Sequence, residues 1–287
     1  MKEKLTPFLK NLAQNNPAIA KQYYAEDELQ DLSYNDPLIE DGHEVVKGLV
    51  HKYTNRALIK VSYLCAAHCR FCTRIRQIGE KSGNLNEQNI KDIVKYLQDH
   101  PEIDDVILSG GDPFYTPQIT SKILTELNKI DSVKVIRIGT RMPFHSPSSF
   151  RTKSILNLLD VIAKVAARKP FYILLHIEHP SELTHETEEV INQLKSYQTT
   201  LLSQTVFLKD INDNFEILYT LFKRIYHLGI IPYYLYHCDR VTGLEKFYGD
   251  INHEKEIAIR LRKELSGIGC PLFVEDIEFG YGKIPVV

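Results

Sequence analysis

Three of the five cysteines lie within eight residues of one another, at Cys65, Cys69 and Cys72 in the stretch YLCAAHCRFCTR. Thiolates bind zinc or iron–sulfur clusters, and a structural site of either kind normally has four protein ligands. Three cysteines on one loop leave a coordination position open to a substrate or cofactor, which is typical of a catalytic site. The alternatives are three buried cysteines without a metal, or a zinc site completed by a distant histidine or cysteine.

The composition is that of a soluble globular protein. At 287 residues, 43% hydrophobic and 25% charged, the chain is long enough for one large domain or two ordinary ones. The net charge is −2 with both signs mixed along the chain, so there is no basic stripe for nucleic acid. The start, MKEKLTPFLKNLAQNN, has no continuous apolar core, and no run approaches the ~18 apolar residues of a membrane span. We therefore expect a cytoplasmic protein that binds neither nucleic acid nor membrane, in which clustered thiols bind metal rather than form disulfides.

Short β-branched runs alternate with segments of helical period from residue 57 onward. One helical pattern spans Ile90 to Leu97, and another spans Leu218 to Ile225, with Gly229 as a stop signal. The expected strands are 57–64, 104–109, 133–139, 171–177, 199–208 and 230–236.

Six strand–helix units, with strands apolar on both faces, predict an α/β fold with a parallel sheet, either open and doubly wound or a barrel. A complete barrel needs two more units, so a partial (β/α)6 barrel fits the count better. Either fold places its chemistry in loops at the C-terminal ends of the strands. We expect a helical N-terminal extension over 1–50, the barrel over 51–270, and a last strand with a glycine-punctuated tail over 271–287.

Polar residues follow several of these strands. In LSGGDP, Gly110 and Gly111 allow close backbone approach, and Ser109 and Asp112 add polar groups. The segments HIEHPSE and SQTVFLKDIND place further polar side chains at later strand ends. Each segment alone is a weak signal, because ordinary strand-to-helix turns also contain such residues.

Lys283 lies near the end of the sequence, in GYGKIP. On sequence alone it is a solvated tail residue. The alternative is the Schiff-base lysine of a pyridoxal phosphate (PLP) enzyme. The phosphate of that cofactor needs cationic partners, and Lys52 and Arg56 in HKYTNR lie just before the first expected strand.

The spacing Cys-x3-Cys-x2-Cys, with Phe71 before the last cysteine, resembles the signature of the radical S-adenosylmethionine (SAM) enzymes, whose fold is a partial six-unit barrel. The ordered segments DPLIEDGHEVVKGLVHKYTNRALI, VILSGGDP, IRIGTRMP, HIEHPSELT, SQTVFLKDINDN, PYYLYHCD and GYGKIPV narrow the resemblance to the lysine 2,3-aminomutases, which also use PLP. The resemblance implies conversion of L-lysine to β-lysine and a flavodoxin- or ferredoxin-type electron donor. It leaves a homo-oligomer open.

The resemblance also implies a role for each candidate residue. A pair of aspartates suits a substrate that ends in an amine and would repel a glutamate-type substrate, because an unpaired buried charge is costly. The 4Fe-4S cluster would be bound by Cys65, Cys69 and Cys72, and SAM by Ser109, Gly110, Gly111, Asp112, His176 and Gln204. PLP would be attached to Lys283, with its phosphate bound by Lys52, Arg56 and Arg141. Arg74 would bind the substrate carboxylate, and Asp239 and Asp276 would bind the distal substrate ammonium.

The chain differs from the larger lysine aminomutases at its C-terminus and at position 214. It ends at Val287, four residues after Lys283, and it has Asn214 where those enzymes have a zinc cysteine. The short C-terminus resembles the branch that makes β-lysine for elongation factor P, whereas Asp276 does not fit that branch. Two other hypotheses stay open: a radical SAM enzyme without PLP, for which Lys283 would be dispensable, and a non-catalytic iron–sulfur or zinc module that senses redox state or carries electrons.

Overall fold

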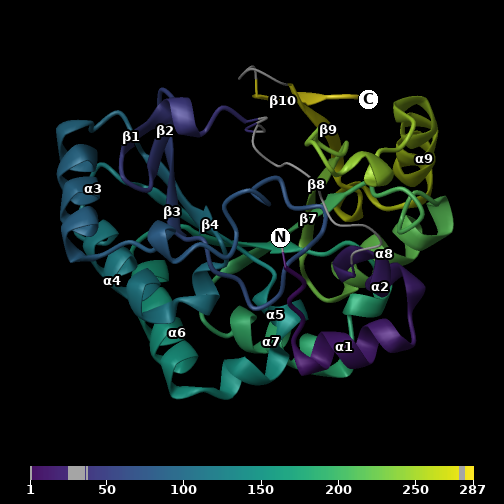
Figure 1. Cartoon of the computed structure of the whole chain (residues 1–287), viewed down its shortest axis with the longest axis horizontal. Helices are drawn as coiled ribbons and strands as arrows, with labels where there is room; N and C mark the ends of the chain where they lie inside the picture. Colours follow the sequence, from purple (N-terminus) through teal and green to yellow (C-terminus); the bar gives the residue numbers. More distant parts are fainter. Residues whose placement is uncertain (1, 25–35, 37, 278–281) are drawn as a thin grey trace.

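A ten-stranded sheet, with its strands in the order β1 to β10, forms the centre of the structure (Figure 1). The computed structural model describes residues 2–24, 36, 38–277 and 282–287. Strands β3 to β9 are parallel to their neighbours, and β1, β2 and β10 add antiparallel pairs at the two edges. The strands are β1 Glu44–Val46, β2 Leu49–Tyr53, β3 Arg56–Ser62, β4 Asp105–Gly110, β5 Val135–Thr140, β6 Phe171–His176, β7 Thr200–Val206, β8 Ile231–Tyr236, β9 Leu272–Ile277 and β10 Gly282–Pro285.

The helices that follow the parallel strands lie in an arc along one side of the sheet, and α1 contacts both α2 and α5 (Figure 1). The α-helices are α1 Pro7–Gln14, α2 Pro17–Tyr23, α3 Glu87–Asp99, α4 Pro117–Leu127, α5 Met142–His145, α6 Lys153–Ala166, α7 His185–Lys195, α8 Phe215–His227 and α9 Ile251–Glu264. The 3-10 helices are η1 Asp41–His43, η2 Lys81–Gly83, η3 Pro113–Tyr115, η4 Pro147–Arg151, η5 Pro180–Glu182, η6 Glu245–Phe247 and η7 Gly267–Gly269.

The expected α/β partial barrel is confirmed. The six expected strands correspond to β3 through β8, and their ends differ from the observed ones by at most two residues. The second helical pattern is α8, which begins where the Asn214 side chain accepts hydrogen bonds from the backbone N–H groups of Glu216 and Ile217. It ends before Gly229, whose φ of 74° is the left-handed conformation that closes helices.

The expectation of a helical extension over residues 1–50 is wrong for its last part. Helices α1 and α2 fit it, but 44–46 and 49–53 form an antiparallel hairpin whose turn contains Gly48 at φ 82°. This hairpin lies at the sheet edge, and with Glu44, His51 and Lys52 its sequence resembles an irregular connection. Residues 25–35 and 37, which belong to the same expectation, lie outside the described residues.

The expected final strand is β9, and the end of the tail forms a further strand, β10. Across this antiparallel pair Gly282 faces Ile277 and Lys283 faces Asp276. The register therefore fixes the position of Lys283 relative to one of the two aspartates singled out by the sequence. Residues 278–281, between the two strands, lie outside the described residues.

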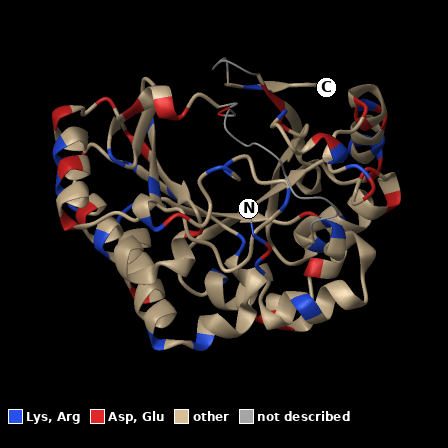
Figure 2. Cartoon of the chain, in the orientation of Figure 1, with Lys and Arg blue, Asp and Glu red and all other residues tan. Residues whose placement is uncertain are grey.

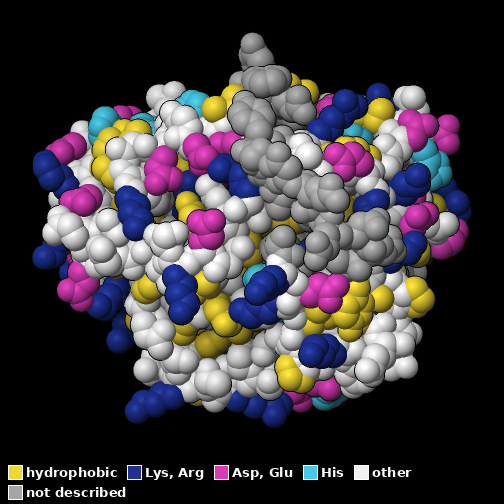
Figure 3. Space-filling model, in the orientation of Figure 1, with side chains coloured by type: hydrophobic (Ala, Val, Ile, Leu, Met, Phe, Trp, Pro, Cys, Tyr) yellow, Lys and Arg dark blue, Asp and Glu magenta, His cyan; other side chains and the backbone are white. Residues whose placement is uncertain are grey.

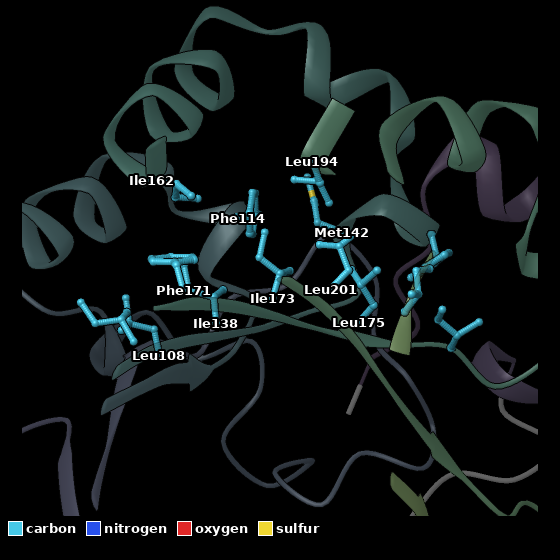
Figure 4. Close-up of a cluster of buried hydrophobic side chains, with 14 of the residues drawn as sticks. Leu108, Phe114, Ile138, Met142, Ile162, Phe171, Ile173, Leu175, Leu194 and Leu201 are labelled. Atoms are coloured by element: carbon cyan, nitrogen blue, oxygen red, sulfur yellow. The ribbon is translucent and has the colours of Figure 1, made fainter. Parts of the chain in front are cut away.

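The main hydrophobic core lies between the sheet and the arc of helices (Figure 4). Side chains such as Leu108, Ile173 and Leu175 point from the strands into this core and are fully buried. Because side chains alternate along a strand, Ser109 and His176 point to the opposite face, where no helix layer packs in the part of the chain that the structure describes. The fold therefore separates an apolar outer face from an inner face that carries polar residues.

No helix within the described ranges is long and apolar enough to cross a membrane. Acidic and basic residues are interspersed along α3 and α9 (Figure 2). The face drawn in Figure 3 also carries both signs of charge side by side.

Candidate active site

The cysteine loop follows β3 and is tied to the N-terminal segment. Lys4 Nζ donates a hydrogen bond to the carbonyl oxygen of Cys65 at 2.6 Å, and the His68 N–H donates to the Lys4 carbonyl oxygen at 2.9 Å. The N–H of Arg70 donates to the carbonyl oxygen of Gln22 in α2 at 2.8 Å. These contacts hold an irregular loop at the C-terminal end of the first parallel strand.

The three thiols of this loop influence one another. Burial raises the pKa of each, to about 12 for Cys69, and charges on Cys69 and Cys72 add to the shift at Cys65. Thiolates here therefore need a positive group beside them, which a bound iron–sulfur cluster would supply. Within the described residues, no three His, Cys, Asp or Glu side chains could hold a single metal ion.

The two glycines of LSGGDP are required by close packing against the cysteine loop. Gly110 has φ 99°, and a Cβ on it would lie 2.6 Å from the Ser62 carbonyl oxygen. A Cβ on Gly111 would lie 2.6 Å from the backbone nitrogen of Leu64. The end of β4 thus lies directly against the segment that leads into Cys65.

Replacing Gly111 with alanine is expected to lower the free energy of unfolding by about 1–3 kcal/mol, because the obstructing atoms are backbone and cannot rotate away. Urea denaturation followed by circular dichroism measures this change. Gly267→Ala is the matched control, since a Cβ there has nothing within 4 Å, and its effect should stay within about 0.5 kcal/mol. Equal effects of the two substitutions would contradict the packing explanation.

Asp112, one of the residues assigned to SAM, is held by groups at the ends of two neighbouring strands. Its carboxylate accepts hydrogen bonds from Thr140 Oγ1 at 2.8 Å, the Arg141 N–H at 2.9 Å and the Phe114 N–H at 3.0 Å. The side chain is buried, and burial raises its pKa. Asp112 therefore caps η3 and joins the ends of β4 and β5, and its assignment to the amino group of SAM stays a prediction.

Three other residues assigned to SAM lie together on the inner face. A Cβ on Gly139 would lie 3.8 Å from Ser109 Oγ and 4.0 Å from His176 Nε2. Gln204 pairs with His176 in the register of β6 and β7. Burial and two nearby arginines lower the pKa of His176 to about 3, so its ring is neutral. The strand ends thus bring a hydroxyl, a neutral imidazole and an amide into one region.

Arg74, expected to bind the substrate carboxylate, already holds a protein carboxylate. Its Nε donates to Glu40 Oε2 at 2.9 Å, its Nη2 donates to Glu40 Oε1, and its Nη1 lies 3.4 Å from Ser109 Oγ. Burial of Glu40 would raise its pKa, but the charge and hydrogen bonds of Arg74 hold that pKa below its ordinary value. An incoming carboxylate would share Arg74 through Nη1 or displace Glu40.

Lys283, Asp276 and Asp239 form a group of charges at the other end of the inner face. Lys283 Nζ donates to Asp276 Oδ2 at 2.8 Å and lies 5.7 Å from the ring centre of Tyr236. Burial and the negative charge of Asp276 raise the pKa of Asp239 to about 7, while Lys283 opposes this shift. Asp276 Oδ1 is buried and has no hydrogen-bond partner within the described residues. This arrangement places an ammonium group beside two carboxyl groups and leaves one acceptor atom unused.

Lys52 and Arg56 both lie close to the ring of Tyr53, which is near the start of β10. The Arg56 guanidinium is 3.9 Å from the Tyr53 ring centre, and Lys52 Nζ is 5.4 Å from it. The Tyr53 hydroxyl oxygen lies 3.3 Å from where a Cβ on Gly282 would be. Since Gly282 precedes Lys283, the two edges of the sheet bring these cations and Lys283 into the same region.

Arg141 does not join the other two residues assigned to the phosphate of PLP. Its guanidinium is buried and donates hydrogen bonds to Cys69, Glu182 and Gln22. These partners belong to the cysteine loop, to η5 and to α2. The sequence placed Arg141 correctly at the end of β5, but it could not indicate which neighbours the side chain contacts.

The sequence interpretation missed Glu40, His145 and Tyr236. Tyr236 accepts a hydrogen bond from Gln204 Nε2 at 2.7 Å and therefore connects the residues assigned to SAM with Lys283. Its position in a strand predicts a buried or half-buried face, and alternation with its neighbours could have placed it on the inner one. Glu40 and His145 belong to no spacing pattern that would single them out.

Several buried polar atoms near the cysteine loop have no hydrogen-bond partner within the described ranges. Buried polar groups are nearly always paired, so a set of unpaired atoms indicates room for a polar ligand. The residues present therefore fit a polar cofactor beside the cysteines. The atoms are Arg141 Nε and His145 Nδ1, whose side chains contact Cys69, and Glu178 Oε1, which lies close enough to Arg141 to feel its charge.

Comparison with solved structures supports this fold. SuiB of Streptococcus suis, solved with S-adenosylmethionine bound, superposes with a TM-score of 0.56 at 15% identity over 80% of this chain and 52% of that one. A radical SAM methyltransferase of Sphaerobacter thermophilus gives a TM-score of 0.55 at 15% identity over 79% and 68%. At such identities the likeness concerns the fold.

Comparison of sequences identifies the family as well as the fold. The family model of the Radical SAM superfamily matches residues 59–222. The chain is 34% identical to the L-lysine 2,3-aminomutase of Escherichia coli strain K12, covering 88% of this chain and 71% of that one. It is 34% identical to the enzyme of that name from Methanococcus maripaludis, over 99% and 66%, and 33% identical to that of Clostridium subterminale, over 88% and 59%. The chain thus spans between 59% and 71% of the length of these relatives. It belongs to the radical SAM superfamily and, within it, to the lysine 2,3-aminomutase family.

Proposed function

We propose that this chain is an L-lysine 2,3-aminomutase, an isomerase that moves the amino group of L-lysine from the α- to the β-carbon and uses PLP in addition to the 4Fe-4S cluster and SAM implied by its superfamily. The observation that carries the proposal is the ammonium of Lys283 beside Asp276 and Asp239. The names of the relatives agree with lysine as the substrate.

The charges on the inner face match the two ends of lysine. Arg74 offers Nη1 to a carboxylate near Ser109, and Asp239 with Asp276 offers acceptors to an ammonium. Because the charge of Arg74 also acts on Asp239, the two groups lie close enough to interact. A substrate with a carboxylate at its distal end would instead bring a third negative charge to the aspartate pair, at a high desolvation cost.

Each chemical role has a residue in reach. When bound, the cluster with SAM supplies a carbon radical, and PLP supplies a conjugated imine that stabilises a radical beside it. Cys65, Cys69 and Cys72 would hold the cluster, and Ser109, His176 and Gln204 would orient SAM. Lys283 would attach PLP, with Lys52 and Arg56 at the phosphate.

Replacing either Asp239 or Asp276 with asparagine is expected to raise KM for L-lysine by roughly 10- to 100-fold, because a hydrogen bond to a charged group contributes about 1.5–3 kcal/mol. Steady-state assays over a range of lysine concentrations measure this. Glu275→Gln is the matched control, since Glu275 neighbours Asp276 on β9 and points to the other face of the sheet. An unchanged KM in both aspartate variants would rule out the ammonium site.

The activity should also depend on pH through Asp239. Its pKa is raised to about 7, so the carboxyl is neutral at lower pH and becomes a carboxylate as pH rises through 7. An ammonium binds the charged form better, so kcat/KM for lysine should rise on the order of tenfold between about pH 6 and pH 8. The profile of Asp239→Asn should lose this rise, and an identical rise in that variant would contradict the assignment.

A panel of substrates tests the proposed function by asking whether the carboxyl groups of Asp239 and Asp276 select lysine. The protein, with iron, sulfide, SAM, PLP and dithionite supplied anaerobically, is given L-lysine, L-norleucine or L-glutamate. Because the site leaves buried polar groups unpaired with the wrong substrate, kcat/KM for lysine should exceed that for the others by on the order of 10⁴-fold. Comparable turnover of norleucine would overturn the proposal that the aspartates select lysine.

A further inference from the structure

Arg141 lies against the thiol of one cysteine, Cys69. Its Nη1 donates to Cys69 Sγ at 3.2 Å, and His145 Nε2 lies 3.7 Å from the same sulfur. The guanidinium carbon is 5.1 Å from the Phe71 ring centre, and the residue is 8% exposed. We propose that Arg141 is a positioning residue for the iron–sulfur cluster, which raises its reduction potential through an N–H···S hydrogen bond and a nearby positive charge.

The position of Arg141 does not depend on the thiol. Its Nη2 donates to Glu182 Oε2 at 2.7 Å and to Gln22 Oε1 at 3.0 Å. Glu182 is itself held, since its Oε1 accepts the backbone N–H groups of Glu178 at 3.1 Å and His179 at 3.0 Å. A buried ion pair with this many partners fixes the guanidinium from the side away from the cysteine loop.

The hydrogen bonding of the three cysteines is asymmetric. Within the described residues, the sulfur of Cys69 accepts a hydrogen bond from a charged side chain, while no such side-chain donor reaches the sulfur of Cys65 or Cys72. The sulfur of Cys69 therefore differs from the other two in having a charged side-chain donor, whereas Cys72 has the backbone N–H and the charge of Arg74 nearby. This asymmetry belongs to the fold, because Arg141 follows β5 and Glu182 follows β6.

The sign of the effect follows from charge. On reduction the cluster core accepts one electron and changes from 2+ to 1+, and no bond to the protein forms or breaks. The added negative charge spreads over the thiolate sulfurs, so a hydrogen-bond donor and a cation beside one sulfur stabilise the reduced form. Burial strengthens this stabilisation because the local dielectric constant is low. This inference rests on membership of the radical SAM superfamily and not on PLP or lysine.

The test is a potentiometric titration of the reconstituted cluster with dithionite, followed by electron paramagnetic resonance, in the absence of lysine and PLP. Arg141→Met should favour the oxidised cluster by at least tenfold, which is a lowering of the midpoint potential by about 59 mV. Arg141→Lys keeps the charge but loses the rigid donor, and should shift the potential less, in the same direction. Iron is measured on each sample, so the potential refers to loaded protein.

Two further variants show whether Arg141 changes the potential of the cluster or only supports the cysteine loop. Arg137→Met on β5 is the control, since that arginine pairs with Asp105 at 2.8 Å and should leave the potential unchanged. Glu182→Gln removes a negative charge while Arg141 stays, and should raise the potential. If Arg141 only supported the cysteine loop, the Arg141 variants would bind less iron or melt at a lower temperature, and the clusters that they do bind would have an unchanged potential. An unchanged potential in loaded Arg141→Lys and Glu182→Gln would overturn the proposal, even if Arg141→Met failed to fold.

Discussion

Replacement of Lys283 with alanine is expected to lower formation of β-lysine by on the order of 10³-fold or more, the scale at which the loss of one member of a catalytic unit acts. Lys283 would attach PLP through its amine, and no other lysine occupies its place opposite Asp276 across the β9 and β10 ladder. The measurement is the rate of β-lysine formation under anaerobic conditions with saturating cofactors.

Lys283→Arg is the matched variant for this prediction. Arginine keeps a cation beside Asp276, and therefore the ion pair seen at 2.8 Å, but it cannot form a Schiff base. Both variants should lose activity, whereas only alanine should alter the stability contributed by the ion pair. Mass spectrometry after borohydride reduction should find a pyridoxyl group on Lys283 of the wild type only. Activity retained by Lys283→Ala would favour a radical SAM enzyme that works without PLP.

Replacement of Cys72 with alanine is expected to remove the iron–sulfur cluster and with it all cleavage of SAM. Loss of an outer-sphere partner costs about 10- to 100-fold in metal affinity, and loss of a direct ligand from a set of three should cost more. Burial raises the pKa of the Cys72 thiol, so the thiolate depends on the metal for compensation. Iron content, the visible absorption of the reconstituted protein and the yield of 5′-deoxyadenosine measure the loss.

Cys270→Ala is the control for the cysteine prediction. Cys270 is buried just before β9, at the N-terminal end of the parallel strands, whereas the cysteine loop lies at their C-terminal ends. This variant should keep its iron and its activity with at most a modest loss of stability. Equal loss of iron from both variants would contradict the assignment of the cluster to the loop.

The repeating part of the fold was predictable because its signals are local. Strands β3 to β8 are short runs rich in apolar residues, and α8 has an Asn214 cap and a Gly229 stop, so their limits follow from the sequence. The hairpin over 44–53 was missed because an edge pair buries little apolar surface, and its polar outer residues resemble a loop. The β10 strand was missed because it is short and depends on pairing with β9.

In the candidate site, too, some residues could be predicted from the sequence and others could not. The cysteines were singled out by residue type and spacing, and Lys283 by the resemblance to the lysine 2,3-aminomutases. The partners of Arg141 and Asp112 were not, because those side chains bind groups from strands and helices far away in the sequence. Glu40 lies 34 positions before Arg74, so no local spacing pattern connects the two residues.

The central claim is that this chain rearranges lysine with a radical generated from SAM and with PLP on Lys283. The most direct measurement is an anaerobic incubation of the reconstituted protein with SAM, PLP and dithionite, with and without L-lysine, in which β-lysine and 5′-deoxyadenosine are quantified together. The account predicts β-lysine from the wild type and none from Lys283→Ala. Formation of 5′-deoxyadenosine by the loaded protein at the same rate with and without lysine, and no β-lysine, would contradict it.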